Sequence, residues 1–151
     1  MSWWKFWETD DREEETPDYY DEGLELMRKE RYHEALTSFR LAHRERPDDA
    51  APLEQMGGAY HEIELTDEAI KHYRKALERD PDSAGAHYGL GFLLANRGRE
   101  GEARRHLAAF LDGAPSDHKA ARHVQHAREK LEELRGSQEP DSPDDQGGED
   151  D

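Results

Sequence analysis

The sequence contains no cysteine and has few apolar residues. Its 151 residues are 33% hydrophobic, and 37 Asp and Glu against 21 Lys and Arg give a formal charge of −16. Without cysteine there can be neither a disulfide nor a zinc site built on thiolates, so the cytoplasm is the expected compartment. The shortage of cations argues against a nucleic-acid partner, because phosphate binding needs a cationic surface. No run approaches the roughly 18 apolar residues that a membrane-spanning helix needs.

Most of the negative charge lies in two flanking segments. Residues 8–15 contain six acids and one Arg, and residues 136–151 contain seven acids and no base. Such compositions cannot bury enough apolar area to offset the entropy of an ordered chain. We therefore expect residues 136–151 to form a disordered acidic tail, and residues 1–15 to form an aromatic docking segment followed by an acidic tether. The region between them is only mildly acidic.

A 34-residue repeat covers residues 16–117 in three copies without gaps: 16–49, 50–83 and 84–117. The recurring positions are Gly23, Gly57 and Gly91; Ala35, Ala69 and Ala103; Phe39, Tyr73 and Leu107; and Pro47, Pro81 and Pro115. Glycine costs about 1 kcal/mol inside a helix, so its recurrence predicts a neighbouring helix that passes too close for a Cβ atom. The proline ends the second helix of each copy, and the Asp or Ser residues at 48–49, 82–83 and 116–117 are predicted to cap the helix that follows.

This pattern resembles the tetratricopeptide repeat, a 34-residue helical hairpin. The resemblance implies an all-α fold, a right-handed α-solenoid of three hairpins, with residues 118–135 as a C-terminal capping helix. The third copy departs from the family pattern at His87 and Phe110, where a bulky and a small residue are usual. The resemblance also implies a non-enzymatic protein–protein interaction module, an adaptor, chaperone or assembly subunit that binds a partner peptide or helix in its concave groove.

The family's groove-facing offsets fall on the first helix of each copy and on the capping helix. They correspond to Tyr20, Leu24, Met27, Glu54, Gln55, His61, Tyr88, Phe92, Asn96, Arg122 and His126. One subtype of the family grips the C-terminal carboxylate of heat-shock proteins with Lys and Asn, and no Lys or Asn stands at those offsets here. We instead expect Tyr88 and Phe92 to anchor a partner, because buried aromatic side chains dominate peptide affinity. Mutual packing of the two rings between repeats is the alternative.

The sequence gives no sign of a catalytic centre, a metal site or a cofactor. A Gly-rich phosphate loop, a His-Glu-x-x-His motif and a Gly-x-Ser-x-Gly motif are all missing. His123 and His126 lie three residues apart on one helical face, but no carboxylate completes a ligand set before Glu129. We therefore predict no enzymatic activity, no metal and no cofactor.

The aromatic start of the chain is its most unusual feature. Trp3, Trp4, Phe6 and Trp7 include every tryptophan of the sequence, and exposing each would cost about 1.5–3 kcal/mol relative to burial. The segment is too short for a signal-peptide core. Its destination stays open: a pocket on a partner, which would make it a second docking element, its own groove or first helix, a membrane interface, or none. A membrane interface is less favoured, because anionic lipid would repel the acidic tether.

Two further interpretations stay open at the level of the sequence. If the aromatic segment anchored the chain to a membrane, the protein would be a membrane-peripheral scaffold of a membrane complex, which is the alternative function. Self-association of the chain is also left open.

Overall fold

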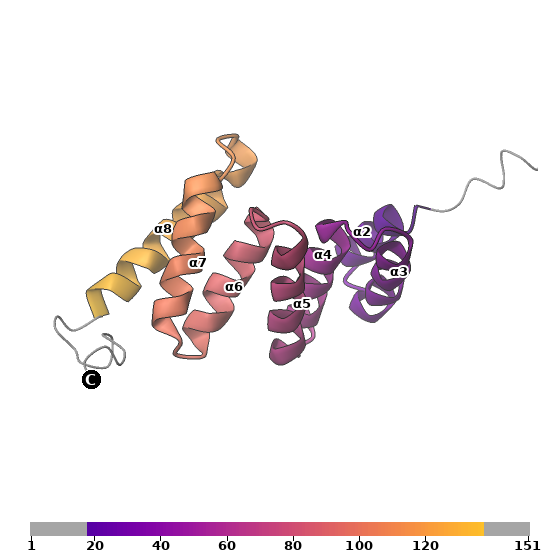
Figure 1. Cartoon of the computed structure of the whole chain (residues 1–151), viewed down its shortest axis with the longest axis horizontal. Helices are drawn as coiled ribbons and strands as arrows, with labels where there is room; N and C mark the ends of the chain where they lie inside the picture. Colours follow the sequence, from indigo (N-terminus) through magenta and orange to yellow (C-terminus); the bar gives the residue numbers. More distant parts are fainter. Residues whose placement is uncertain (1–17, 138–151) are drawn as a thin grey trace, which may run out of the picture.

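The structure is a computed structural model, and it describes residues 18–137 of the chain. This part forms seven helices: α2 (Tyr19–Arg28), α3 (Tyr32–Glu45), α4 (Ala50–Glu62), α5 (Thr66–Arg79), α6 (Ala84–Asn96), α7 (Glu100–Gly113) and α8 (His118–Ser137). Three helical hairpins, α2–α3, α4–α5 and α6–α7, lie side by side in chain order, and α8 follows them (Figure 1). The predicted all-α solenoid with a capping helix is confirmed.

The first helix of each hairpin begins at a capping side chain. Asp18, Asp49 and Ser83 precede α2, α4 and α6, and each accepts a hydrogen bond from a backbone N–H of the first turn. Asp117 does the same for the N–H of Ala120 in α8, at 2.9 Å. These bonds satisfy N–H groups that a helix leaves without a partner. They explain why each new helix begins directly after the Pro-containing linker.

The turn inside each hairpin holds one residue in the left-handed region. These residues are Glu30 (φ 60°), Glu64 (φ 66°) and Gly98 (φ 81°), again 34 residues apart. In each turn the next residue donates its N–H to a carbonyl five positions back, at 2.8 or 2.9 Å, which is the bond of a Schellman motif. The three hairpins therefore turn in the same way, although only Gly98 suits the conformation.

The recurring glycines make room for a side chain and not for a neighbouring backbone. A Cβ atom on Gly23 or Gly57 would lie under 3.0 Å from the ring of Phe39 or Tyr73, which belongs to the second helix of the same hairpin. Gly91 meets Leu107 in the same way. The prediction that a neighbouring helix leaves no room for a Cβ atom is confirmed, and the group that fills the space is the side chain of the bulky residue 16 positions later.

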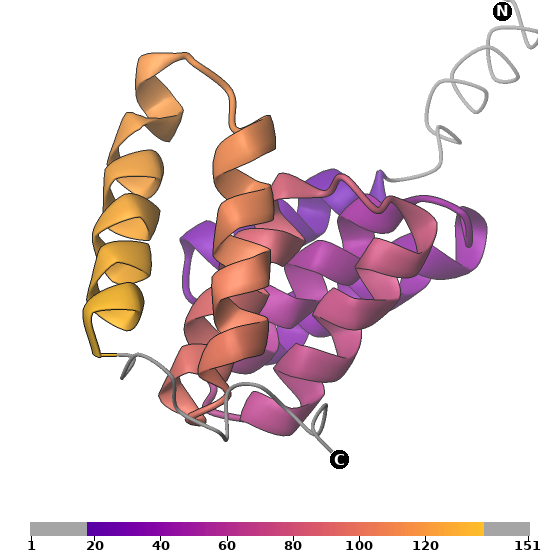
Figure 2. The same cartoon turned by 60° about the vertical axis from the view of Figure 1, so that its left-hand side comes forward.

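The last hairpin is covered by α8. This helix runs alongside α7 (Figure 2) and also packs against α6. Ala127, Leu131 and Leu134 are buried in the contact and Val124 is partly buried, whereas Ala121 is exposed. The helix therefore covers the apolar face that a further hairpin would otherwise cover. None of the helices in residues 18–137 is long and apolar enough to cross a membrane.

Candidate functional site

Two adjoining hollows lie between α4, α6 and α8, and together we call them the trough. The first hollow, of about 320 Å³, is lined by His61, Tyr73, Tyr88, Gly89, Phe92, Leu93, Asn96 and His126. The second, of about 370 Å³, is lined by Glu54, Gln55, Gly58, Tyr73, Ala84, Gly85, Tyr88, Phe110, Pro115, Ala120 and His123. Tyr73 and Tyr88 border both hollows. The two hollows of the trough therefore adjoin each other at these two side chains.

Tyr88 connects α6 to the last two helices. Its ring centroid lies 4.8 Å from that of Phe92 and 5.1 Å from those of Phe110 and His123. Burial raises the pKa of its hydroxyl, so the hydroxyl remains protonated and can donate to Nδ1 of His126, 2.9 Å away. Tyr88 is half-buried. It therefore packs against its neighbours and still presents an edge to the trough.

Tyr73 forms the floor between the two hollows. The ring is wedged between α4 and α6, where a Cβ atom on either Gly57 or Gly89 would lie under 3.0 Å from it. Burial raises the pKa of its hydroxyl, and the carboxylates of Glu54 and Glu62 act in the same direction. The hydroxyl therefore stays neutral at physiological pH. The recess that the two glycines leave for this ring gives the floor its shape.

One carboxyl group enters the trough from α4. Oε1 of Glu54 accepts a hydrogen bond of 2.8 Å from the hydroxyl of Ser83, the residue that caps α6. Burial raises the pKa of Glu54, the bond from Ser83 opposes this, and the charge of Asp80 adds to the increase. The bond joins the second hairpin to the third at the rim of the trough.

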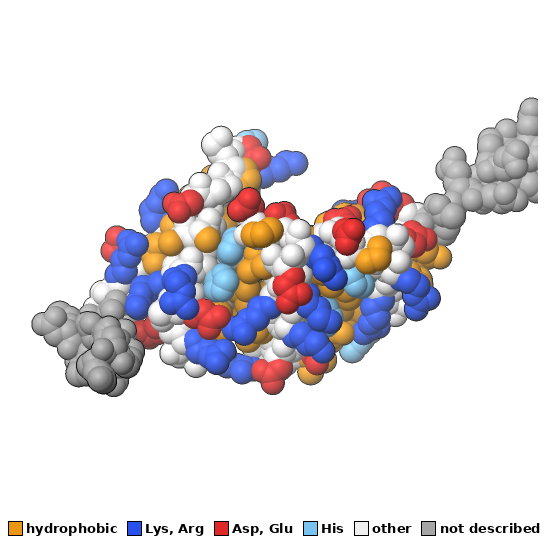
Figure 3. Space-filling model, viewed as in Figure 1, with side chains coloured by type: hydrophobic (Ala, Val, Ile, Leu, Met, Phe, Trp, Pro, Cys, Tyr) orange, Lys and Arg blue, Asp and Glu red, His pale blue; other side chains and the backbone are white. Residues whose placement is uncertain are grey.

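The trough differs in charge from the outer helices. Within residues 18–137, no Lys or Arg is among the residues that line the two hollows. Over α5 and α7, by contrast, basic and acidic side chains alternate on the surface (Figure 3). Arg74 of α5 and Glu102 of α7 form one such ion pair, at 2.8 Å. The same part of the chain contains no group of three His, Asp or Glu side chains placed to hold a metal ion.

Seven of the residues predicted to face the groove line the trough: Glu54, Gln55, His61, Tyr88, Phe92, Asn96 and His126. Met27 lies at its α2 edge, with Cε 3.8 Å from the place of a Cβ atom on Gly58. That these residues contact a partner stays a prediction.

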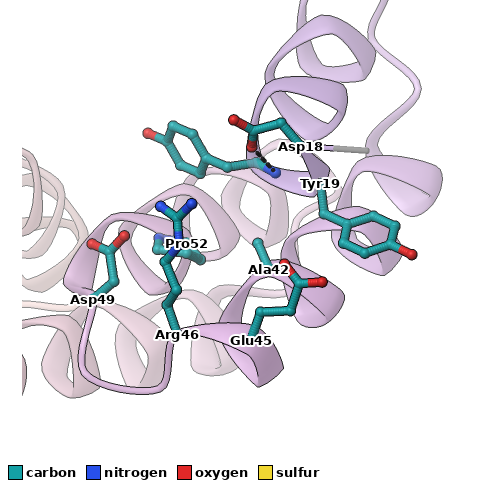
Figure 4. Close-up of a pocket in the computed structure, with 8 residues that line it drawn as sticks. Asp18, Tyr19, Ala42, Glu45, Arg46, Asp49 and Pro52 are labelled. Atoms are coloured by element: carbon teal, nitrogen blue, oxygen red, sulfur yellow. Dashed lines mark hydrogen bonds between the residues drawn. The ribbon is translucent and has the colours of Figure 1, made fainter. Parts of the chain in front are cut away.

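The remaining predicted residues lie elsewhere. Leu24 is half-buried against the core, and Arg122 is exposed on α8 and lines neither hollow. Tyr20 pairs with Phe39, 5.8 Å between ring centroids, and lines a separate small hollow beside the start of α2 (Figure 4). Trp3, Trp4, Phe6 and Trp7 lie outside the described residues.

Sequence reasoning did not place Tyr73, Phe110 and His123 in the trough. Tyr73 was identified only as one of the recurring positions of the repeat. The signal that could have placed it is Gly89, a second helical glycine in the third copy, which accepts the far side of the ring. Gly89 lies in the third copy and Tyr73 in the second. An alignment of the copies compares equivalent positions and therefore does not reveal a contact between two different copies.

A family model described as TPR repeat matches residues 66–98. A peroxisomal targeting signal receptor from Candida albicans is 32% identical over 89 residues, which are 59% of this chain and 15% of the receptor. The chain thus spans about 15% of the length of that relative.

Solved structures of low sequence identity share the fold. The Yersinia enterocolitica type III secretion chaperone SycD, in complex with a peptide of the translocator YopD, superposes with a TM-score of 0.73 at 16% identity, covering 80% of this chain and 92% of the chaperone chain. The TPR2B domain of yeast Sti1, in a complex with pHsp70, gives 0.69 at 18% identity, covering 80% and 95%. Residues 66–98 therefore match a TPR repeat, and the described residues share the fold of these structures, with three hairpins followed by a capping helix.

Proposed function

We propose that this protein–protein interaction module binds an apolar segment of a partner protein, a peptide or a helix, in the trough. The observation that supports this is the pair of hollows on either side of Tyr88, lined without Lys or Arg, in a chain with a formal charge of −16. A peptide with two large apolar side chains would fill both hollows. Such anchors supply most of the binding free energy in peptide complexes.

The similar structures support a peptide as the occupant. The SycD structure contains a translocator peptide and the Sti1 domain is in a complex with pHsp70. Recognition of a terminal carboxylate does not suit this trough, because a carboxylate would find no cation among the residues that line it. We therefore propose internal apolar segments as the ligands, as expected of an adaptor, a chaperone or an assembly subunit.

Gly58 allows a sharp test of the trough. A Cβ atom on Gly58 would meet only ordinary contacts, 3.6 Å from the Tyr73 hydroxyl and 3.8 Å from Met27. A long side chain there can therefore enter the second hollow without disturbing the core. Gly101, on α7, is the matched control, because its nearest neighbour is an Arg104 nitrogen at 3.8 Å and both substitutions remove a helical glycine.

The experiment selects peptides from a displayed random library on the full chain and measures their affinities by fluorescence anisotropy. We expect peptides with two apolar anchors, whose affinity falls at least about tenfold, or 1.4 kcal/mol, in Gly58→Gln and stays unchanged in Gly101→Gln. Equal binding to both variants, with unchanged circular dichroism, would contradict the proposal.

A further inference from the structure

The first hairpin has a stacking face that nothing covers within residues 18–137. In the second hairpin, α4 packs on the first hairpin, and its residues Leu53, Met56 and Tyr60 are only 2%, 2% and 8% exposed. The Tyr60 hydroxyl accepts a hydrogen bond of 3.0 Å from Arg40 of α3, and its ring lies 4.8 Å from that of His72 in α5 of its own hairpin. We refer to the corresponding residues of α2, 34 positions earlier, as the front face.

The front face consists of Tyr19, Glu22 and Leu26. Tyr19 and Leu26 are half-buried, with Leu26 packed against the core, and Glu22 is exposed and accepts a hydrogen bond of 3.1 Å from the hydroxyl of Ser38 in α3. The Tyr19 side chain points away from Pro52 and the second hairpin (Figure 4), and it does not belong to the hydrophobic core. Tyr19 and the exposed part of Leu26 are therefore available at the end of the solenoid that α8 does not cover.

We propose that the aromatic segment Trp3, Trp4, Phe6 and Trp7 docks on the front face of its own chain. The segment ends only ten residues, 8–17, before the first described residue. Ten residues reach up to about 33 Å, whereas the ten residues of α2 are about 15 Å long. The connection is thus long enough to place the segment anywhere along α2. A short tether also gives a local concentration in the millimolar range.

The charges on both sides of this contact are complementary. Glu22 lies in the middle of the front face, and Lys5 is the one base among residues 1–7. Lys5 would therefore meet an opposite charge on the front face. The hollow beside the start of α2, by contrast, is lined by Asp18, Glu45 and Asp49 as well as by Arg46 (Figure 4).

A second copy of the chain suits the front face less well. Asp21, Glu22 and Glu25 are exposed on α2, and two copies meeting through α2 would bring these acids together. Each copy also has a formal charge of −16. Like charges at close range oppose such a dimer.

Tryptophan fluorescence tests the proposal directly in the full chain, because all three tryptophans belong to the segment. We expect blue-shifted emission and protection from acrylamide, a neutral quencher, relative to a synthetic peptide of residues 1–17. Both should be independent of protein concentration. Emission identical to that of the peptide overturns the proposal, and a blue shift that appears only at high concentration assigns the face to a second copy and also overturns it.

Variants locate the docking place. Tyr19→Asp should move the emission and the quenching to the values of the peptide, whereas Leu65→Asp, at a leucine that is 48% exposed in the α4–α5 turn, should leave them unchanged. A response to Tyr88→Ala with Phe92→Ala, but not to Tyr19→Asp, would place the segment in the trough and overturn the proposal.

A charge exchange provides a second test, which does not depend on whether the Tyr19→Asp variant folds. Lys5→Glu and Glu22→Lys should each reduce the protection from acrylamide, and the double variant should restore it. Additive losses in the double variant would contradict docking at Glu22. None of these fluorescence measurements depends on a partner. They would therefore test the docking of the segment even if no partner bound in the trough.

Discussion

The first helices of the second and third hairpins share a framework but differ in what they present to the trough. Gly57 of α4 and Gly91 of α6 each leave space for a bulky side chain from the second helix of their own hairpin. At the position that enters the trough, however, α4 carries Glu54 and α6 carries Tyr88, and α6 has no Asp, Glu, Lys or Arg at all. The 34-residue period therefore determines the framework, whereas the trough uses positions that the period leaves free to vary.

The largest expected effect comes from the framework. Gly57→Ala places a Cβ atom under 3.0 Å from the Tyr73 ring, and overpacking of this kind costs about 1–3 kcal/mol. The adjacent Gly58→Ala, whose Cβ atom has room, should instead stabilise the protein by about 0.5–1 kcal/mol. Urea unfolding followed by circular dichroism measures both. If Gly57→Ala and Gly58→Ala changed the free energy of unfolding in the same direction, the distinction between framework and trough positions would be contradicted.

The turns inside the hairpins give the next effect. Glu64 adopts a left-handed conformation, which costs a residue with a Cβ atom about 1 kcal/mol. Glu64→Gly should therefore raise the free energy of unfolding by up to about that amount, reduced by the greater freedom of glycine in the unfolded chain. The reverse exchange, Gly98→Glu, should lower it. If both substitutions destabilise, the three turns are not equivalent.

Acid should weaken the third hairpin through His106. Burial is the largest cause that lowers the pKa of His106, the charge of nearby His87 also lowers it, and Glu102 opposes both. The unfolded chain then binds this proton more readily, so the free energy of unfolding falls as the pH drops below about 6.5 and levels off below the folded pKa. His106→Gln should flatten this part of the profile, with His33→Gln, at an exposed histidine, as the control. Equal profiles would contradict the assignment.

The smallest effect is expected at Glu54. Because burial raises the pKa of its carboxyl, the folded state disfavours the charged form, and the penalty is present above the folded pKa and disappears as the pH falls below the unfolded pKa. Glu54→Gln keeps an oxygen that can accept the bond from Ser83. The variant should therefore melt slightly higher than the original protein at pH 7 and no higher in acid, as measured by thermal unfolding. A lower melting temperature at pH 7 would show that the charge itself stabilises the rim.

The helical hairpins could be predicted from the sequence, because the recurring Gly and Ala residues indicate positions of close packing and the recurring Pro residues indicate helix ends. It was not sufficient for the left-handed turns, since Glu30 and Glu64 carry no local signal for that conformation and only Gly98 does. The trough was partly predictable from the resemblance, which led to Tyr88 and Phe92. The position of Tyr73 was not predictable in the same way, because its ring occupies space left by glycines of two different hairpins.

The order of packing has a mechanical consequence. The described helices contact only those next to them or one further along the chain, so no contact joins the first hairpin to the last. The stability of such an array is close to a sum over units and their junctions. Under a pulling force applied to its ends, the molecule should consequently lengthen in successive steps, one hairpin at a time, instead of giving way in a single event.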